Sequence, residues 1–196
     1  MTKSELRKIY LARQRDLSAG ERAEKSQQIA SHFFLTFDLA QIKVLHCFIA
    51  IERFNEIDTT LIFQQLWSGF PQITTAVPRV NLKSNEIENL KFTRDTDLVQ
   101  NLWKIHEPIH DEYIATERID MVLVPLLCFD KQGHRVGYGK GFYDKFLGNC
   151  RPDCLKIGLS YFRPVNEVSD IGPHDTALDF CVTPEMIFYL ETKKGE

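Results

Sequence analysis

The chain has 196 residues, the length of one domain of ordinary size and enough to bury a core without disulfides. Hydrophobic residues make up 43% of the sequence and charged residues 26%, a composition that excludes a disordered or collagen-like chain. The net charge of −3 argues against a protein that coats nucleic acid, and no apolar run is long enough to cross a membrane. We therefore expect one domain, residues 1–196, that is monomeric and has no nucleic-acid or membrane partner.

The cysteines indicate the compartment. Their odd number and wide spacing in a chain of this length are typical of reduced intracellular thiols. They are Cys47, Cys128, Cys150, Cys154 and Cys181. The N-terminal segment lacks the apolar core of a secretory signal, and its acidic residues are untypical of a mitochondrial presequence. We expect a cytoplasmic protein.

Two helices are predicted at the start of the chain. The first covers residues 2–16, with one stripe formed by Leu6, Ile9, Arg13 and Leu17. Ser18 followed by Glu21 is a capping-box pattern, which predicts that a second helix begins there. In that helix Phe33, Phe34 and Phe37 recur at helical spacing and are expected in the core.

The next segments alternate between strand and helix patterns. Residues 44–49 form an apolar run of strand length, and Asp58 is placed to cap a third helix over residues 59–67. Residues 74–77 predict a strand that Pro78 stops, and residues 81–97 predict a polar hairpin around residues 90–93.

The second half of the chain contains the clearest buried strand, residues 119–125. A glycine-rich loop, a short helix over residues 142–147, and strands at 156–159 and 180–182 follow it. Apolar strands that alternate with helices predict an α/β fold, a three-layer sandwich with a mostly parallel sheet flanked by helices. Ligands of such sheets lie beyond the carboxyl ends of the strands, where the loop after Pro125 is expected.

The glycine-rich loop carries the strongest chemical signal. Gly137-Tyr-Gly-Lys-Gly141 has a glycine at every second position, which allows backbone N–H groups to converge on an anion. The following helix adds its positive end, and Arg135 and Lys140 add charges suited to phosphate. Asp144 is placed to bind Mg²⁺ beside those phosphates. The loop therefore predicts a site for a nucleotide or a phosphate ester.

Two common phosphate-binding motifs do not match this loop. A P-loop needs Ser or Thr after its Gly-Lys pair, whereas Gly141 follows Lys140. A dinucleotide-binding loop needs glycine three residues after Gly139, where Phe142 stands.

The loop and its surroundings resemble the 5-formyltetrahydrofolate cyclo-ligase family. Its signature resembles Pro-x-x-x-Phe-Asp-x-x-Gly-x-Arg-hydrophobic-Gly-x-Gly-x-Gly-Tyr/Phe-Tyr-Asp, and this sequence matches it in register from Pro125 to Asp144. Further matches extend over nearly the whole chain. They are Lys3 with Arg7, Asn55–Thr59, Val77–Arg79, Glu107–Pro108, Lys156–Leu159 and Pro173–Asp175.

The resemblance implies a reaction and a set of site residues. The reaction converts 5-formyltetrahydrofolate and ATP into 5,10-methenyltetrahydrofolate, ADP and phosphate. ATP would be bound by Lys3, Arg7, Arg135, Val136, Gly137, Tyr138, Gly139, Lys140, Gly141, Phe142 and Tyr143. The folate would be bound by Ile51, Glu56, Tyr138, Gly139, Lys140, Gly141 and Phe142. Asp144 and Asp175 would hold Mg²⁺, and Lys140, Arg135 and Tyr143 would act in catalysis.

The chemistry of this reaction suits these residue types. A formamide is a poor electrophile, and phosphorylation of its oxygen by ATP lets the neighbouring N10 close the ring while phosphate leaves. Catalysis of this kind depends on positioning and on stabilising charge around a transferring phosphoryl group. Lysine, arginine, Mg²⁺ and backbone N–H groups provide that stabilisation.

Other interpretations remain open at this stage. One is a non-catalytic binder of folate or of a phosphorylated ligand. Another is a sugar-phosphate isomerase, for which Glu56 is the nearest candidate base. A zinc site from His106, His110, Cys150 and Cys154 has suitable ligand types, but nothing in the sequence brings the two pairs together. Asp130 is expected to shape its turn, and Asp179 is a weaker metal candidate than Asp175.

Overall fold

The structure is a computed structural model that describes residues 1–81, 83–84, 86–101 and 105–191. In these residues seven strands form one sheet in the order β11-β10-β9-β6-β1-β2-β3. Neighbouring strands from β10 to β2 pair in parallel, while the edge strands β3 and β11 are antiparallel to their neighbours. The bounds are β1 Val44–Cys47, β2 Thr74–Asn81, β3 Glu86–Lys91, β6 Met121–Pro125, β9 Leu155–Leu159, β10 Phe180–Val182 and β11 Ile187–Tyr189. The prediction of a mostly parallel sheet is confirmed.

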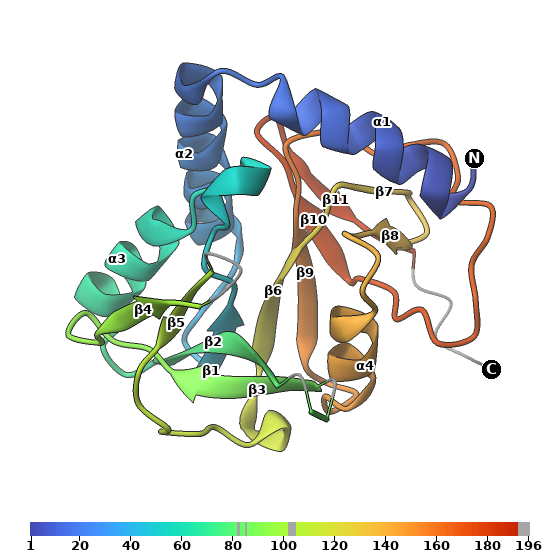
Figure 1. The fold of residues 1–196 in the computed structure, drawn as a ribbon. Helices are drawn as coiled ribbons and strands as arrows, with labels where there is room; N and C mark the ends of the chain where they lie inside the picture. Colours follow the sequence, from blue (N-terminus) through green and yellow to red (C-terminus); the bar gives the residue numbers. More distant parts are fainter. Residues whose placement is uncertain (82, 85, 102–104, 192–196) are drawn as a thin grey trace.

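Helices cover both faces of this sheet (Figure 1). Helices α2 (Ala19–Thr36) and α3 (Thr60–Gly69) lie on one face, and α4 (Phe142–Gly148) lies on the other. Helix α1 (Lys3–Arg15) lies apart from these three and contacts the small hairpin of β7 (Cys128–Phe129) and β8 (Arg135–Val136). A second small hairpin joins β4 (Leu98–Gln100) to β5 (His106–Pro108), and single 3₁₀ turns, η1 and η2, lie at Glu52–Phe54 and Thr116–Arg118. The predicted three-layer α/β sandwich is confirmed.

The alternation of side chains along the strands produces one core on each face of the sheet. Leu45 and Cys47 of β1 point into the core under α2 and α3, where Phe33 is completely buried. Val44 of β1 and Val122 of β6 belong to the core under α4. A third, smaller cluster lies beneath α1, and it includes Leu6, Tyr10 and Val136.

The position of β1 determines where a ligand site can form. Strand β1 pairs with β2 on one side and with β6 on the other, so the chain winds in opposite directions from this point. In open α/β sheets the crevice at such a switch point, beyond the carboxyl ends of the strands, is the usual ligand site. The 3₁₀ turn η1 follows β1 there, and the β7–β8 hairpin follows β6.

The two N-terminal helices begin close to where the sequence predicts. Thr2 and Ser18 cap them, and each forms a capping box with the glutamate three residues later, Glu5 or Glu21. The predicted stripe of the first helix is wrong, because Ile9 is 41% exposed. The buried residues of α1 are instead Leu6, Tyr10 and Gln14, an i, i+4 row that faces the β7–β8 hairpin and η1.

The prediction that Pro78 stops its strand is wrong. Strand β2 continues through Pro78 to Asn81 and pairs with β3, where Pro78 lies opposite Asn89. The N–H of Thr74 points toward β1, so the alternation along a strand points the nitrogen of Pro78 the same way. Pairing with β1 ends at Ala76, so the N–H that proline lacks would have no partner there.

The predicted hairpin is also displaced, because β2 extends beyond Pro78. Residues 90 and 91 are the end of β3 rather than the centre of a turn, and the β2–β3 connection lies between Asn81 and Glu86, where residues 82 and 85 are outside the described part. Asp58 is not the N-cap of α3 as predicted. The N-cap is Thr59, and the Asp58 carboxylate accepts a hydrogen bond from the N–H of Thr60 instead.

All five cysteines are free thiols, as predicted. Among the described residues there is no helix with the length and apolar character needed to cross a membrane.

Candidate functional site

A buried ion pair links the glycine-rich loop to α4. Arg135 in β8 is 8% exposed, and its Nη2 lies 2.6 Å from Oδ1 of Asp144 in the first turn of α4. Its other terminal nitrogen donates to the carbonyl oxygen of Thr176, and the Thr176 N–H donates back to Asp144 over 3.4 Å. Arg135 and Asp144, nine residues apart in the chain, therefore connect β8 to α4 and to the segment before β10.

A second ion pair brings the N-terminus of α1 to the same place. The ammonium group of Lys3 contacts the carboxylate of Asp175, and the Lys3 N–H donates to Asp170 over 2.6 Å. Burial acts to raise the pKa of Asp175, but its contacts with Lys3 and with the N–H of Gly172 hold that pKa below its usual value. Arg135 also interacts electrostatically with Asp175. The structure thus gathers Lys3, Arg135, Asp144 and Asp175, four of the predicted site residues.

Arg7 follows Lys3 by one helical turn and lies against the glycine-rich loop. Its Nε donates to the carbonyl oxygen of Gly137 over 2.9 Å. A Cβ on Gly139 would come within 2.9 Å of the guanidinium carbon of Arg7, and Gly139 has a φ of +87°. Gly139 therefore adopts a left-handed backbone that favours glycine, and its lack of a side chain leaves room for the guanidinium group of Arg7.

The remaining loop residues differ in what they offer. Lys140 is exposed, and its ammonium group makes no hydrogen bond or ion pair within the described residues. Val136 is buried in the cluster beneath α1, so only its backbone can face a ligand. The hydroxyl of Tyr143 is buried, and no described residue is its hydrogen-bond partner. Phe142, like Gly141 before it, lies at the start of α4.

Glu56 and Ile51 belong to a separate, less polar part of the site. Glu56 is 8% exposed, and its Oε2 accepts a hydrogen bond from the N–H of Ile51 over 2.8 Å. Burial raises the pKa of Glu56 to about 7, against the opposing effects of Ile51 and of a hydrogen bond with the hydroxyl of Tyr138. A small cavity of about 10 Å³, lined by Glu56 and Tyr138, lies here at the carboxyl ends of β1, β6 and β9.

The structure adds residues to this part that the sequence did not suggest. Gln14 lines the cavity from α1, and its Nε2 donates to the hydroxyl of Tyr138 over 3.0 Å and to the carbonyl oxygen of Phe54 over 2.6 Å. Phe54 stacks on the Tyr138 ring, with 5.1 Å between ring centres. The sequence did contain one signal for Gln14, which follows Leu6 and Tyr10 at helical spacing. A glutamine on such an apolar stripe is buried and needs a polar partner.

The acidic residues fit a Mg²⁺ ion that is held partly by phosphate. Asp144 and Asp175 lie close enough that both interact with Arg135, and one or two carboxylates with phosphate oxygens are the usual Mg²⁺ ligands in proteins. Within the described ranges no three histidine, cysteine, aspartate or glutamate residues are grouped to hold a metal by themselves. The zinc interpretation therefore has no support, since the described His106, His110, Cys150 and Cys154 form no such group.

Two other aspartates have structural roles. Asp130 is fully buried, and its carboxylate accepts hydrogen bonds from the backbone of Gln132, His134 and Val168, so it shapes the β7–β8 turn as expected. Asp179 accepts from the N–H of Lys156 over 2.8 Å at the start of β9.

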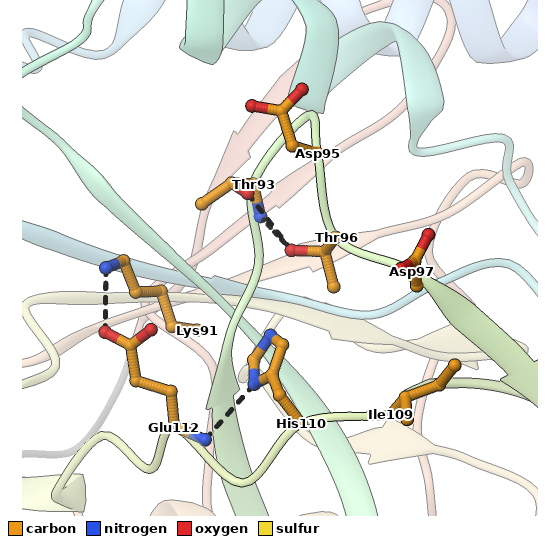
Figure 2. Close-up of a pocket in the computed structure, with 8 residues that line it drawn as sticks. All are labelled: Lys91, Thr93, Asp95, Thr96, Asp97, Ile109, His110 and Glu112. Atoms are coloured by element: carbon orange, nitrogen blue, oxygen red, sulfur yellow. Dashed lines mark hydrogen bonds and ion pairs between the residues drawn. The ribbon is translucent and has the colours of Figure 1, made fainter.

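A larger hollow, about 390 Å³, lies elsewhere, between the end of β3 and the segment that follows β5 (Figure 2). Its lysine, Lys91, is paired with Glu112 at 2.7 Å, and Asp95 and Asp97 point in different directions. Its described lining residues include none of the predicted site residues and no unpaired lysine or arginine for phosphate, so the end of the sheet near β1 and β6 is the stronger candidate.

Comparison with known proteins agrees with this geometry. Residues 1–184 match the model of the 5-formyltetrahydrofolate cyclo-ligase family. A relative named 5-formyltetrahydrofolate cyclo-ligase from Mycoplasma genitalium is 31% identical over 185 residues, 92% of this chain and 96% of the relative. The protein of that name from Escherichia coli K12 is 27% identical over 90% of this chain and 97% of its own length.

A solved structure extends the similarity to three dimensions. The NMR structure of the Aquifex aeolicus 5,10-methenyltetrahydrofolate synthetase superimposes with a TM-score of 0.82 at 27% identity, over 100% of this chain and 96% of that one. The family match covers the glycine-rich loop, both ion pairs and the Glu56 pocket. The chain belongs to the 5-formyltetrahydrofolate cyclo-ligase family.

Proposed function

We propose that this protein catalyses the ATP- and Mg²⁺-dependent cyclisation of 5-formyltetrahydrofolate to 5,10-methenyltetrahydrofolate, with release of ADP and phosphate. The observation that carries the proposal is the meeting of Lys3, Arg7 and Arg135 from two distant segments beside the Glu56 pocket, in a chain of this family. The arrangement provides a charged half for phosphates and an adjoining buried half for a ring system.

The charged half is proposed to bind ATP. Lys3 and Arg7 would contact its phosphates from α1, and Arg135 would contact them from β8. Gly137, Gly139 and Gly141 would offer backbone N–H groups together with those of Val136, Tyr138, Lys140, Phe142 and Tyr143. The ion pairs of Lys3 with Asp175 and of Arg135 with Asp144 fix the positions of these two cations.

The buried half is proposed to bind the folate. Among the described residues that line the small cavity, Glu56 is the only acidic one, and a carboxylate there can accept hydrogen bonds from pterin N–H groups. Ile51 positions it through the backbone hydrogen bond described above, and its side chain would meet the ring. The loop from Tyr138 to Phe142 lies between the two halves and would contact both substrates.

The proposed catalytic residues act on charge rather than as nucleophiles. ATP supplies the phosphoryl group that activates the formyl oxygen, after which N10 closes the ring. The ammonium group of Lys140 pairs with no other described residue and can stabilise the transferring phosphoryl group, and Arg135 can do so from a fixed position. The Tyr143 hydroxyl has no described partner, and it can donate to a phosphate or formyl oxygen. Asp144 and Asp175 would hold Mg²⁺, which would neutralise phosphate charge.

The test is the near-ultraviolet absorbance of the conjugated methenyl bridge after the protein is mixed with 5-formyltetrahydrofolate, ATP and Mg²⁺. We expect a rise that requires all three. Lys140→Ala should lower kcat by about 10²–10³-fold, the usual effect of removing one group that stabilises transition-state charge. The matched control is Lys145→Ala, which removes an exposed lysine of α4 that pairs with Glu86 instead.

Two results would contradict the proposal. Absence of product, with 5-formyltetrahydrofolate or ATP still bound in calorimetry, would identify a non-catalytic binder. Equal rates in the Lys140 and Lys145 variants would remove Lys140 from the catalytic group.

A further inference from the structure

The pocket beside Glu56 is closed in this structure. Its volume of about 10 Å³ is close to that of one water site, whereas pockets for organic ligands usually measure about 300–1,000 Å³. Only 8% of Glu56 is exposed. A bicyclic ring cannot reach this carboxylate until a side chain moves.

Tyr138 is the side chain that closes the pocket from the loop. Its ring stacks on Phe54, tilted by 26° with 5.1 Å between centres. Its hydroxyl interacts with the Glu56 carboxyl group, and burial raises the pKa of Tyr138, which keeps the hydroxyl protonated and able to donate. Tyr138 thus stacks an aromatic ring on Phe54 and directs a hydrogen-bond donor to Glu56. A planar substrate bearing N–H groups would make the same two contacts.

Gln14 fastens this arrangement from α1. Its Nε2 donates both to the Tyr138 hydroxyl, over 3.0 Å, and to the carbonyl oxygen of Phe54, over 2.6 Å. The side chain is 3% exposed, so these hydrogen bonds are protected from competing water. One amide group therefore holds both members of the stacked pair.

The backbone around Tyr138 allows the ring to leave. Tyr138 stands between Gly137 and Gly139, and glycine on both sides permits large φ and ψ changes at low cost. Arg7 touches both glycines, through the hydrogen bond to Gly137 and the close approach to Gly139. The same short segment thus contacts a proposed phosphate-binding residue and the ring pocket.

We infer that Tyr138 is a gate over the Glu56 pocket and that Gln14 is a positioning residue that holds the gate shut while no ring is bound. The identity of the occupant as the pterin end of the folate rests on the proposed function. When the gate opens, the Tyr138 ring and hydroxyl leave the pocket. A planar ring with N–H donors then stacks on Phe54 and donates hydrogen bonds to Glu56. The binding affinity measured for the ring is then reduced by the fraction of molecules that are closed.

The experiment compares Gln14→Met and Tyr138→Phe with the wild-type protein. Both changes keep the size of the side chain and remove the hydrogen bonds of the latch. Since each such bond is worth a factor of about five, the Kd of 5-formyltetrahydrofolate in calorimetry without ATP should fall about threefold to tenfold. Gln27→Met, at an exposed position on α2, is the matched control and should leave this Kd unchanged. An unchanged or higher Kd in both latch variants would overturn the gate.

A second readout does not depend on folate. In the ¹³C NMR titration of Glu56, Tyr138→Phe should raise the pKa of the carboxyl group above its wild-type value, because a hydrogen bond to the charged form is lost. An unshifted titration would show that the hydroxyl does not hold Glu56 and would overturn the gate. If the wild-type protein binds no folate but the titration shifts, the proposed function fails while the latch stands. Should Gln14→Met fail to fold, Tyr138→Phe tests the same hydrogen bonds.

Discussion

The guanidinium group of Arg135 lies 2.6 Å from the carboxylate of Asp144, and these two residues connect a strand of the β7–β8 hairpin to the first turn of α4. The arginine side chain is 5% exposed and the aspartate side chain 32% exposed, so the cation depends on this partner more than the carboxylate does. The ion pair therefore has a structural role in addition to its proposed place beside phosphate and Mg²⁺.

Asp144→Asn should lower the free energy of unfolding by about 1–3 kcal/mol. The change leaves the buried Arg135 without its charged partner, and the exposed side of Asp144 reduces the cost below that of a fully buried pair. Urea denaturation measures it. Asp153→Asn, which removes a 75% exposed aspartate from an ion pair with Arg151, should cost much less. Equal losses of unfolding free energy in the two variants would show that the buried ion pair stabilises the fold no more than the exposed one.

Gly139→Ala should weaken ATP binding, whereas Gly137→Ala should change it little. At Gly139 an added methyl group would meet the Arg7 guanidinium group at 2.9 Å and the φ of +87° is unfavourable for alanine, so Arg7 is displaced. At Gly137 the added methyl group meets nothing within 4 Å and φ is not positive. We expect about a tenfold higher KM for ATP in the first variant, since a charge-assisted contact is worth at least that factor. Matching KM values would contradict a role for Arg7.

Glu56→Gln should stabilise the protein at high pH. Burial raises the pKa of Glu56 from 4.5 to about 7, so the folded state holds its proton more tightly than the unfolded state. Stability is therefore complete below about pH 4.5 and declines as pH rises through about 7. Glutamine resembles the protonated form and avoids this decline. The gain should approach about 3 kcal/mol at pH 8 and vanish at pH 4, as measured by denaturation at each pH. A gain independent of pH would mean that burial does not shift this carboxyl group.

His46→Leu should protect the protein against acid. His46 in β1 is fully buried beside Phe146, with 4.8 Å between ring centres, and neither ring nitrogen bonds to another described residue. Burial lowers the pKa of His46 from 6.5 to about 3, so stability is lost as pH falls from about 6.5 toward about 3. Leucine cannot be protonated and leaves no unpaired donor, and we expect about 1–3 kcal/mol of added stability at pH 7 and more at pH 5. An unchanged acid-unfolding midpoint would refute this.

Local patterns explain why much of the fold was predictable. The capping box at Ser18, the apolar run that contains β6, and the glycine-rich loop are each contained within a few residues. The position of Asp144 close to Arg135 also follows from nine residues of chain. The order of the strands does not, and the tolerance of Pro78 depends on where β1 ends, at Cys47, 31 residues away in the chain.

The part of the site that sequence reasoning missed is held by distant contacts. Gln14 meets Tyr138 across 124 residues and Phe54 across 40, and nothing near Gln14 in the chain indicates either partner. The two-residue strands β7 and β8 are too short to show a period. The roles of the predicted site residues stay predictions until the variants above are measured.

The docking of α1 has a consequence for how the protein is made. Some polar contacts of this helix are with Phe54 and Asn55, 40 residues later, but those with Gly137, Tyr138 and Asp175 span 124 or more residues. During translation these distant contacts of α1 cannot form until the glycine-rich loop and then Asp175 have been synthesised. The docking of α1 should therefore be completed late in folding, and a nascent chain stalled before Gly137 should already contain β1, β2 and β6 without it.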